Sequence, residues 1–520
     1  MNISIKNLAT CLLTAVCALV FFDLRAQPKV TELLKKYNTT LFYINEFYFD
    51  TVNFEQIVDR SIVSALQALD PHSYYIPKEE YKQMSEPLEG NFEGIGIEFN
   101  ILEDTLIVVT PLVGGPSEKV GLQSKDRIIK VDGKNITNIS LTIEKVHSLL
   151  RGPKGSKVAL TIKRGTATIE FEIIRDKIPI NSLEAAYEPE KGVAYIKLSR
   201  FAKTSMNEIL DAFAKFDNPQ SLILDLRHNG GGLMDAAIHL VDQFLSKGKL
   251  IVYTEGLHSP VRRATSTDNG VFLNGNLAVL IDESSASASE IVAGAVQDWD
   301  RGVIIGRRSF GKGLVQNEFR MDDGSAIRLT VARYHTPSGR AIQSPYEKGK
   351  KEEYYTSFVS RMSSEMFVPD SIKFPDSLKY QTLVKKRTVY GGGGIMPDIY
   401  VPMDTSNYSQ YTGELARKGS LSRFLSSYID RHGNEIKSQY PTFETFRQSY
   451  TVTEAIFAQM VDYAEKDGVK KDENGIRISG NYLKHYMKAV IARYLFDNNS
   501  YYIILNENDR EFAKALEMVR

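Results

Sequence analysis

Cysteine is almost missing from this sequence, and the two that occur, Cys11 and Cys17, both lie near the N-terminus. A disulfide framework, a cysteine-based zinc site and a catalytic cysteine are therefore excluded from the rest of the chain. An excess of charge of either sign is missing too, because 64 lysines and arginines balance 64 aspartates and glutamates. This balance removes the whole-chain electrostatic argument for nucleic-acid binding and leaves only a local basic patch open.

In its other features, the amino-acid composition is that of an ordinary globular protein. The chain has 520 residues, of which 42% are hydrophobic and 25% are charged. These values exclude a mainly disordered chain and a collagen-like fibre. A single hydrophobic core stops growing well below this length, so we expect about three to five modules.

Residues 1–26 predict a secretory signal peptide. Lys6 supplies the positive start, residues 8–22 form an uncharged apolar run, and Ala26 is a small residue suited to cleavage. The run is shorter than the roughly 20 residues of a membrane span, although an uncleaved anchor remains the alternative. We therefore expect an exported protein of the periplasm or cell envelope, either soluble or peripherally associated with the membrane.

The pattern of hydrophobic residues after the signal peptide predicts a multidomain α+β protein. Residues 27–85 show a helical period, 86–176 contain short strands with glycine turns, and 177–403 alternate apolar strands with helices. An insertion at about 348–385 interrupts this α/β part. The tail at 404–520 is charged, rich in tyrosine and mainly helical in pattern.

A serine-rich string follows one of the apolar strands. The strand Val279–Ile281 leads into residues 284–290, of which four are serines, and a helical run comes directly after. A serine at such a strand-to-helix turn is exposed, and the free N–H groups of the helix N-terminus favour developing negative charge. This arrangement suits a serine nucleophile in acyl transfer. The alternative is a helix cap that happens to be rich in serine.

Two further loops carry residue types that acyl transfer needs. Lys312 stands between two glycines soon after another apolar strand, and a lysine drawn into a desolvated place can act as a neutral base. Gly230-Gly231-Gly232 follow a buried strand and leave backbone N–H groups free to meet an oxyanion. The alternatives are a solvated lysine and a plain tight turn.

A histidine base is the commoner chemistry, and His228 and His335 lie near these loops. Neither is near a G-x-S-x-G string, so we expect both to be structural. The eight histidines do not cluster as metal ligands, and no H-E-x-x-H occurs.

Taken together, these segments resemble the carboxyl-terminal processing proteases, which are the S41 class of serine peptidases with a Ser-Lys mechanism. The resemblance covers about residues 30–403, and nothing after about 405 can be aligned. The matching strings are 285–290, 310–316 and 225–232, with further matches at 69–73, 94–97, 334–340 and 392–398.

The resemblance implies a role for five residues. Ser287 matches the nucleophile, and Lys312, 25 residues later, matches the general base. Gln316 matches the residue that orients the lysine. The backbone N–H groups of Gly231 and Ala288 match the oxyanion hole.

Two positions depart from the family pattern. Gly230 stands where the family usually has proline, which should loosen that turn, and Met396 stands where threonine is more usual. Neither change removes a catalytic group. By the same analogy the core is a crotonase-like or ClpP-like α/β sheet, and no metal or organic cofactor is implied.

The β-rich segment at 86–176 matches the PDZ domain of the family. Such a domain adds an extended peptide to a sheet edge and caps the terminal carboxylate with backbone N–H groups. The helix at 142–150 is expected to form the other wall of the groove, although a PDZ fold with a degenerate groove is the alternative. The carboxylate-binding loop is matched by Gly94, Ile95, Gly96 and Ile97.

The sequence thus predicts an exported serine endopeptidase that recognises unstructured, apolar C-termini of proteins and cleaves through an acyl-enzyme. Its expected partners are protein or peptide substrates, not nucleic acid, with a homo-oligomer or an adaptor protein left open. The alternative is a PDZ-containing scaffold that binds peptides without turnover.

Overall fold

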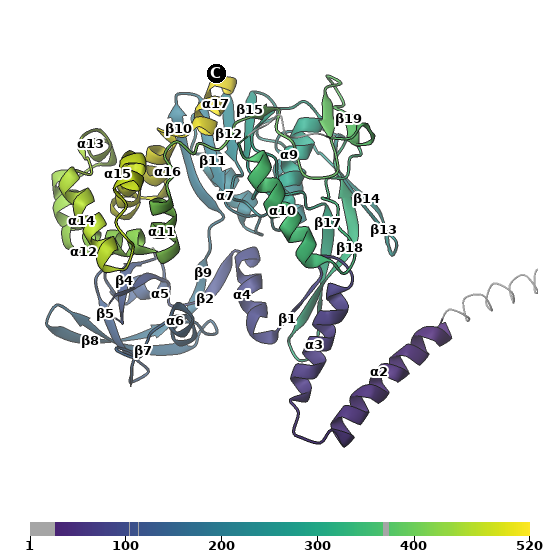
Figure 1. The fold of residues 1–520 in the computed structure, drawn as a ribbon. Helices are drawn as coiled ribbons and strands as arrows, with labels where there is room; N and C mark the ends of the chain where they lie inside the picture. The colour runs from purple at the N-terminus through teal and green to yellow at the C-terminus, as the bar shows by residue number, and fades with distance from the viewer. Residues whose placement is uncertain (1–26, 103, 113, 368–373) are drawn as a thin grey trace, which may run out of the picture. The chain divides into compact units, whose positions relative to one another are not determined.

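The computed structural model describes residues 27–102, 104–112, 114–367 and 374–520 (Figure 1). The predicted signal peptide lies outside the described residues. The chain divides into two compact units, 1–69 and 70–520. Within the described ranges, no helix is long and apolar enough to cross a bilayer.

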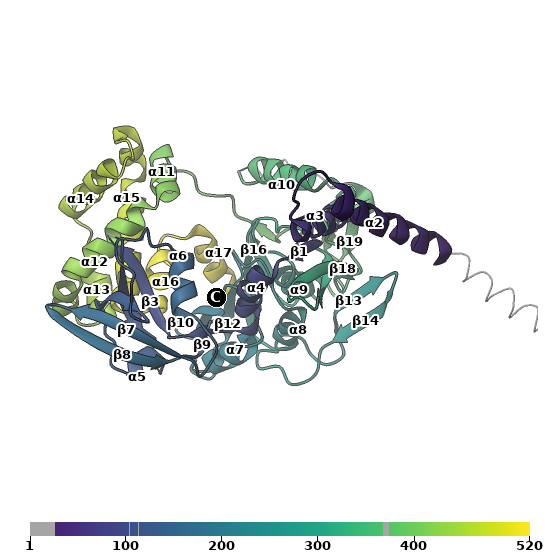
Figure 2. The same cartoon turned by 90° about the horizontal axis from the view of Figure 1, so that it is seen from below.

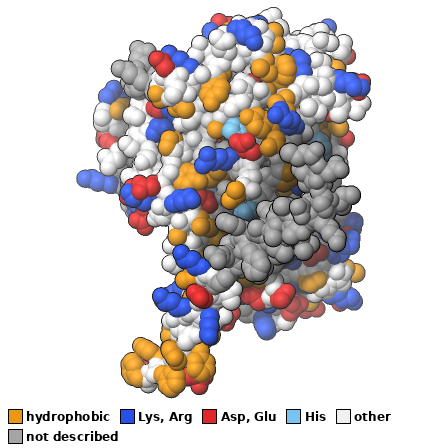
Figure 3. Space-filling model, turned by 90° about the vertical axis from the view of Figure 1, so that its right-hand side faces the viewer, with side chains coloured by type: hydrophobic (Ala, Val, Ile, Leu, Met, Phe, Trp, Pro, Cys, Tyr) orange, Lys and Arg blue, Asp and Glu red, His pale blue; other side chains and the backbone are white. Residues whose placement is uncertain are grey.

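The first unit consists, in its described part, of two helices, α2 (Gln27–Phe47) and α3 (Phe54–Gln67). The side chain of Asn53 caps α3 by accepting a hydrogen bond of 3.0 Å from the Gln56 N–H. The helices predicted here are confirmed. The periodic apolar side chains of α2 are exposed within this structure, among them Val30, Leu33 and Leu34. Phe47, Tyr48 and Phe49, at the end of α2 and in the turn that follows, are exposed as well. Figure 3 shows hydrophobic side chains, coloured orange, gathered at the lower end of the view.

The second unit begins with a break in the helical pattern. Asp70 Oδ1 accepts hydrogen bonds from the backbone N–H groups of His72 and Ser73, which turns the chain after the proline. The chain then forms the short strand β1 (Tyr74–Ile76) before α4 (Lys78–Glu89). The prediction of helix up to residue 85 missed β1, which is stabilised by antiparallel pairing with a distant strand, β18.

The β-rich segment folds into an antiparallel sheet with the order β3-β4-β5-β7-β8, to which β6 adds by pairing with β5. Strand β3 begins only at Ile97, because Gly96 adopts a φ of +73° and turns the chain. The helix predicted at 142–150 is present. The bounds are β2 Asn91–Gly94, β3 Ile97–Leu102, β4 Thr105–Pro111, α5 Pro116–Lys119, β5 Arg127–Val131, β6 Lys134–Asn135, α6 Ile143–Leu150, β7 Lys157–Arg164, β8 Ala167–Ile174 and β9 Asp176–Pro179.

The predicted α/β part is built on a sheet with the order β10-β11-β12-β15-β16-β21, parallel from β11 onward. Both faces of its central strands are buried, as their continuous apolar sequence predicts. The bounds are β10 Leu183–Glu190, β11 Val193–Leu198, α7 Ser205–Phe213, β12 Ser221–Asp225, α8 Met234–Asp242, β15 Asn276–Ile281, α9 Ala288–Asp298, β16 Val303–Gly306 and β21 Ile399–Tyr400.

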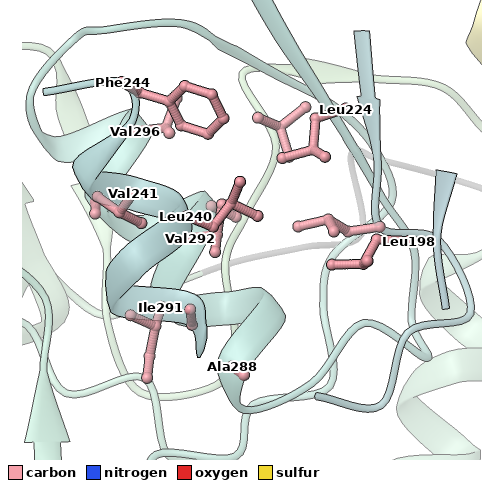
Figure 4. Packing of buried hydrophobic residues seen from close by; sticks show 14 of the residues in the cluster. Leu198, Leu224, Leu240, Val241, Phe244, Ala288, Ile291, Val292 and Val296 are labelled. Atoms are coloured by element: carbon pink, nitrogen blue, oxygen red, sulfur yellow. The ribbon is translucent and has the colours of Figure 1, made fainter. Parts of the chain in front are cut away.

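Successive residues of each central strand face opposite layers of helices. Leu222 and Leu224 of β12 join the core under α8 and α9, and Figure 4 shows side chains of these helices packed toward the strands. Ile223 points to the other face, where it joins a cluster with Phe512 and Val519 from the end of the chain. In Figure 2 α17 (Arg510–Val519) lies on one side of these strands, and α8 and α9 lie on the other.

A second sheet is ordered β1-β18-β13-β14 with β17 paired to β18, and of these strands β17 and β18 follow the lysine loop in the chain. Its long strand β18 reaches from Ala326 to His335. The remaining bounds in this region are β13 Leu250–Gly256, β14 Ser259–Thr265, β17 Leu314–Arg320, α10 Lys351–Glu365, η2 Asp376–Leu378, β19 Lys379–Gln381 and β20 Thr388–Tyr390.

The tail is helical, as predicted, and has a core of its own. Phe424, Phe446, Met460 and Met487 are among its buried residues. The helices are α11 Gln410–Lys418, α12 Ser420–Gln439, α13 Phe443–Ser449, α14 Glu454–Lys466, α15 Glu473–Leu495, α16 Asn498–Asn506 and α17. The structure therefore has the mixed, multidomain α+β architecture that the sequence predicts.

Candidate functional site

Ser287 differs from its neighbouring serines in what its side chain does. Ser285 and Ser289 are fully buried, and their hydroxyl groups donate hydrogen bonds of 2.8 Å to the carbonyls of Leu226 and Asn229. Ser287 is only half-buried, and its hydroxyl donates to no described residue. Of Ser285, Ser287 and Ser289, only Ser287 therefore has an accessible hydroxyl whose proton is not already donated within the turn.

The backbone at Ser287 is strained. Ser287 directly precedes the first residue of α9. Its φ is +56° and its ψ is −111°, a backbone conformation that residues other than glycine rarely adopt. Strain of this kind persists only where the surroundings enforce it, and it is concentrated at functional sites.

The glycine turn packs directly on the serine turn. A Cβ atom placed on Gly231, whose φ is +100°, would lie 2.9 Å from Ser287 Cβ and 3.0 Å from the Ala288 nitrogen. Only glycine allows this approach. Gly230 is open to solvent and meets no such neighbour, so glycine is not required at the position where the family pattern has proline.

The two predicted oxyanion donors differ in this structure. The Ala288 N–H donates to no described residue. The Gly231 N–H donates 2.9 Å to the side-chain oxygen of Asn229, which also bonds the Leu198 carbonyl through its amide nitrogen. Both donors lie beside Ser287. The hydrogen bond from the Gly231 N–H to Asn229 must break before this N–H can bind a substrate oxygen.

One buried carboxylate joins the serine turn to the lysine loop. Glu290 Oε2 accepts hydrogen bonds from the backbone N–H of Ser287 at 2.8 Å and of Lys312 at 2.9 Å. Its Oε1 accepts from the Ser309 hydroxyl at 2.5 Å and from the Gly311 N–H at 2.7 Å. Burial raises the pKa of Glu290 to about 7, against these four bonds, which favour the carboxylate.

A buried tyrosine bonds the same two residues through their carbonyl groups. The Tyr334 hydroxyl lies 3.1 Å from the Ser287 carbonyl oxygen and 2.7 Å from that of Lys312. Glu290 and Tyr334 thus hold the backbones of Ser287 and Lys312 from their N–H and C=O sides. Both residues stand in strings that the sequence analysis singled out, but no sequence pattern revealed that they would meet here.

Lys312 is held in a largely buried position. Burial lowers the pKa of its amine, the nearby positive charge of Arg328 lowers it further, and the charges of Glu290 and Asp70 oppose this change. The neutral amine that a general base requires is therefore favoured more than in an exposed lysine. His72 also lies in this region, and its own burial lowers its pKa to about 4.

Gln316 is placed on β17 beside the strand β18. Its amide nitrogen lies 3.4 Å from the Thr330 hydroxyl and 3.3 Å from the Leu314 carbonyl. The Thr330 hydroxyl in turn donates 3.0 Å to Asp70. In this structure Gln316 therefore bonds to the surroundings of Lys312 and makes no hydrogen bond to the lysine amine itself.

The two histidines near these loops pair with carboxylates. His228 Nδ1 lies 2.8 Å from Asp282, and His335 Nε2 lies 3.1 Å from Glu255. Neither makes a hydrogen bond to Ser287. Over the described ranges, no group of three or more histidine, cysteine, aspartate or glutamate side chains is arranged to hold a metal ion.

The predicted carboxylate-binding loop lies in the β-rich domain, between β2 and β3. The carbonyls of Ile95 and Gly96 accept 3.0 Å hydrogen bonds from the N–H groups of Ser117 and Leu112, which fixes the loop. The N–H groups of Ile95 and Gly96 donate to no described residue. Phe99 of β3 contacts His147 of α6, with ring centroids 6.0 Å apart, so these two elements face each other as a groove requires.

Three family models match parts of the chain. Residues 192–349 match peptidase family S41, residues 107–164 match a PDZ domain, and residues 411–497 match a family of unknown function. The matched ranges contain the serine, glycine and lysine loops, helix α6 of the groove and most of the helical tail. The carboxylate-binding loop and β3 lie just before the matched PDZ range.

Curated relatives match over most of their length. A probable CtpA-like serine protease of Staphylococcus haemolyticus is 32% identical over 354 residues, which are 66% of this chain and 71% of the relative. The carboxy-terminal-processing protease of Bartonella bacilliformis is 36% identical over 56% of this chain and 68% of its own. Among solved structures, the photosystem II D1 C-terminal processing protease is 28% identical, with a TM-score of 0.34, over 59% of this chain and 83% of its own.

Proposed function

Because the chain belongs to the carboxy-terminal processing proteases of peptidase family S41, we propose that Ser287 and Lys312 are the nucleophile and the general base of its reaction. The chain is a serine peptidase that carries a PDZ domain. The observation that carries the assignment is the Glu290 carboxylate, which bonds the backbone N–H groups of both residues.

The reaction proceeds through an acyl-enzyme. The neutral Lys312 amine takes the proton of the Ser287 hydroxyl, whose oxygen attacks the carbonyl carbon of the scissile peptide bond. The tetrahedral oxyanion forms at the N-terminus of α9, where the N–H groups of Ala288 and Gly231 stabilise it. Lys312 then protonates the leaving amine, and water cleaves the acyl-enzyme with the lysine again as base.

The other proposed parts support this reaction from outside the bond-making atoms. Gln316 orients the lysine by holding Thr330 and, through it, Asp70, whose charge acts on Lys312. The predicted domain boundaries stay predictions, as does export by the segment 1–26. Oligomeric assembly and binding of an adaptor protein also remain open proposals.

Substrate selection belongs, in this proposal, to the PDZ domain. The free N–H groups of Ile95 and Gly96 bind the terminal carboxylate of an unstructured protein, and an apolar last side chain enters the groove beside Phe99. Peptidase activity itself is a property of the family, whereas a preference for apolar C-termini is proposed here.

The experiment compares three forms of one peptide, ending in an apolar residue with a free carboxylate, in the same residue amidated, or in aspartate. Binding of each peptide is measured with the full-length Ser287→Ala protein, and cleavage of each peptide is measured with the unchanged enzyme. Hydrogen bonds to charged groups contribute about 1.5–3 kcal/mol each, so amidation should weaken binding roughly 10- to 100-fold. The aspartate form should lose a similar amount, because its charge is buried without a partner.

The outcomes separate the alternatives. Equal binding of the three peptides would contradict C-terminal selection by this domain. Binding of the free acid without any cleavage would favour the non-catalytic scaffold. An amidated peptide supplied in large excess should still be cleaved, because Ser287 and Lys312 lie outside the PDZ domain.

Activity should also rise with pH. The reaction needs the neutral amine of Lys312 and the carboxylate of Glu290, and both forms become more populated as pH increases. The pKa of Lys312 is lowered, mainly by burial. The rise of activity therefore begins at a lower pH than an exposed lysine would give. The measurement is kcat/KM of a peptide from acid to mildly alkaline pH, with peptide binding by the Ser287→Ala protein as control. A flat or falling profile of kcat/KM would exclude a lysine base.

A further inference from the structure

The last helix of the chain packs on the sheet that carries the active-site loops. Phe512 and Val519 of α17 join a buried cluster with strand residues such as Ile223. The Val519 carbonyl accepts hydrogen bonds from the Ser221 hydroxyl at 2.6 Å and from the Asn276 side chain at 3.0 Å. The end of α17 is therefore bonded to β12 and β15, the strands that lead into the glycine and serine turns.

Glu511, near the start of α17, contacts two arginines with its two carboxylate oxygens. Its Oε2 accepts a hydrogen bond of 2.6 Å from Arg227, and its Oε1 accepts one from Arg307. Arg307 also donates 2.7 Å to Glu283. One side chain of the tail thus lies at the centre of an ionic cluster formed with residues of the protease core.

These partners have equivalent places in the three active-site loops. Arg227 stands four residues before Gly231, Glu283 stands four before Ser287, and Arg307 stands five before Lys312. All three follow the carboxyl ends of neighbouring parallel strands, β12, β15 and β16. The cluster therefore connects the beginnings of the glycine, serine and lysine loops.

The cluster is nearly closed to water. The side chains of Arg227, Arg307 and Glu511 are exposed by only 11%, 10% and 8%. Interactions between charges are strong and directional where water is excluded, so removing one charge changes the positions of the side chains that paired with it. Each arginine keeps another partner if Glu511 is neutralised, because Arg227 also pairs with Asp225 and Asp509, and Arg307 with Glu283.

We propose that Glu511 is a positioning residue, which fixes the three loops carrying Gly231, Ser287 and Lys312 relative to one another. Glu511 is then the residue of the C-terminal helix that affects catalysis, and it does so only through these loops. The inference rests on the assignment of Ser287 and Lys312 made above.

The test uses the full chain with Glu511→Gln, which keeps the shape of the side chain and removes its charge. We expect kcat to fall at least tenfold with KM and peptide binding unchanged, because the loops shift and the PDZ groove does not. Labelling of Ser287 by a fluorophosphonate, which needs no PDZ binding, should slow by a similar factor.

Two variants of the same helix are controls. Glu517→Gln removes an exposed carboxylate that, among the described residues, pairs only with Lys514 of α17, and it should leave kcat unchanged. Val519→Ala loosens the packing of α17 without a change of charge, so it should lower the melting temperature and keep kcat well below that temperature.

The inference is overturned if Glu511→Gln turns over at the normal rate. It is also overturned if Val519→Ala loses as much kcat as Glu511→Gln at an equal loss of melting temperature, since Glu511 would then serve only stability. Ser287→Ala measured in parallel separates the two proposals: residual turnover there refutes the site assignment, whereas an inactive Ser287→Ala with a fully active Glu511→Gln refutes the role of Glu511 alone.

Discussion

Ser287→Ala and Lys312→Ala should each lower turnover by roughly 10⁴-fold or more, with the fold intact. Each variant removes one partner of the proton transfer between the hydroxyl and the amine. The Ser287 hydroxyl donates to no described residue, and its backbone is held by Glu290 and Tyr334, so its removal should cost little stability. The measurement is kcat for a peptide with an apolar C-terminus, together with the melting temperature.

The double variant should be no less active than either single variant, because the two residues act as one unit. Ser285→Ala and Ser289→Ala are the matched controls from the same turn. They remove buried hydrogen bonds to the Leu226 and Asn229 carbonyls and should act mainly on stability. Substantial turnover by Ser287→Ala would refute its role, and loss in one control at full stability would move the nucleophile to that serine.

The sequence predicted those elements whose residues carry a local pattern. The strands β12 and β15 are continuous apolar runs, and the small residues around Ser287 favour a tight turn into α9. The family strings then placed Gly231, Ser287 and Lys312 in order along the chain. The sequence strings alone suggest that the turns of Gly231 and Ser287 lie near each other. The structure shows that the two turns are in direct contact.

Contacts made across the fold were not visible in the sequence. β1 pairs with β18, some 250 residues away in the chain. Its tyrosines and isoleucine favour strands, but three residues are too few to show an alternating pattern. The meeting of Tyr334 with Ser287 and Lys312 depends in the same way on how β18 passes the lysine loop. The contact of Glu511 with Arg227 and Arg307 joins the tail to loops over distances of more than 200 residues in sequence.

The bond from Gln316 to Thr330 illustrates a second limit. The family string predicts a role toward Lys312, but a glutamine side chain has several rotamers and can reach different partners from the same backbone position. Its amide bonds Thr330 and the Leu314 carbonyl in this structure. A sequence match therefore fixes which residue stands beside the lysine more firmly than it fixes the hydrogen bond that the residue makes.

Glu290→Gln should be the most damaging substitution of a residue that does not itself react. The carboxylate has four acceptor positions in use, two on each oxygen. A glutamine keeps one oxygen, and its NH₂ group must then face two of the four donors. If the NH₂ group faces Ser309 and Gly311, the Gly311 N–H meets a donor in place of its acceptor, whereas the Ser309 hydroxyl can accept instead of donate. If the NH₂ group faces the other way, the N–H groups of Ser287 and Lys312 both lose their acceptor.

Hydrogen bonds to a charged acceptor contribute about 1.5–3 kcal/mol each. Either orientation of the glutamine loses at least one of these bonds and weakens the others, because the acceptor no longer carries a charge, so we expect kcat/KM to fall roughly 100-fold. The melting temperature should fall as well, because buried donors lose their acceptor. Ser309→Ala removes only one donor and leaves the bonds to Ser287 and Lys312, so it should lose much less activity. Tyr334→Phe tests the carbonyl side of the same pair, and since each carbonyl has a second lone pair we expect a smaller loss than for Glu290→Gln. If Glu290→Gln folds and keeps nearly full turnover, the carboxylate does not position Ser287 and Lys312, and their relative placement must then depend on Tyr334 and the packing of the loops.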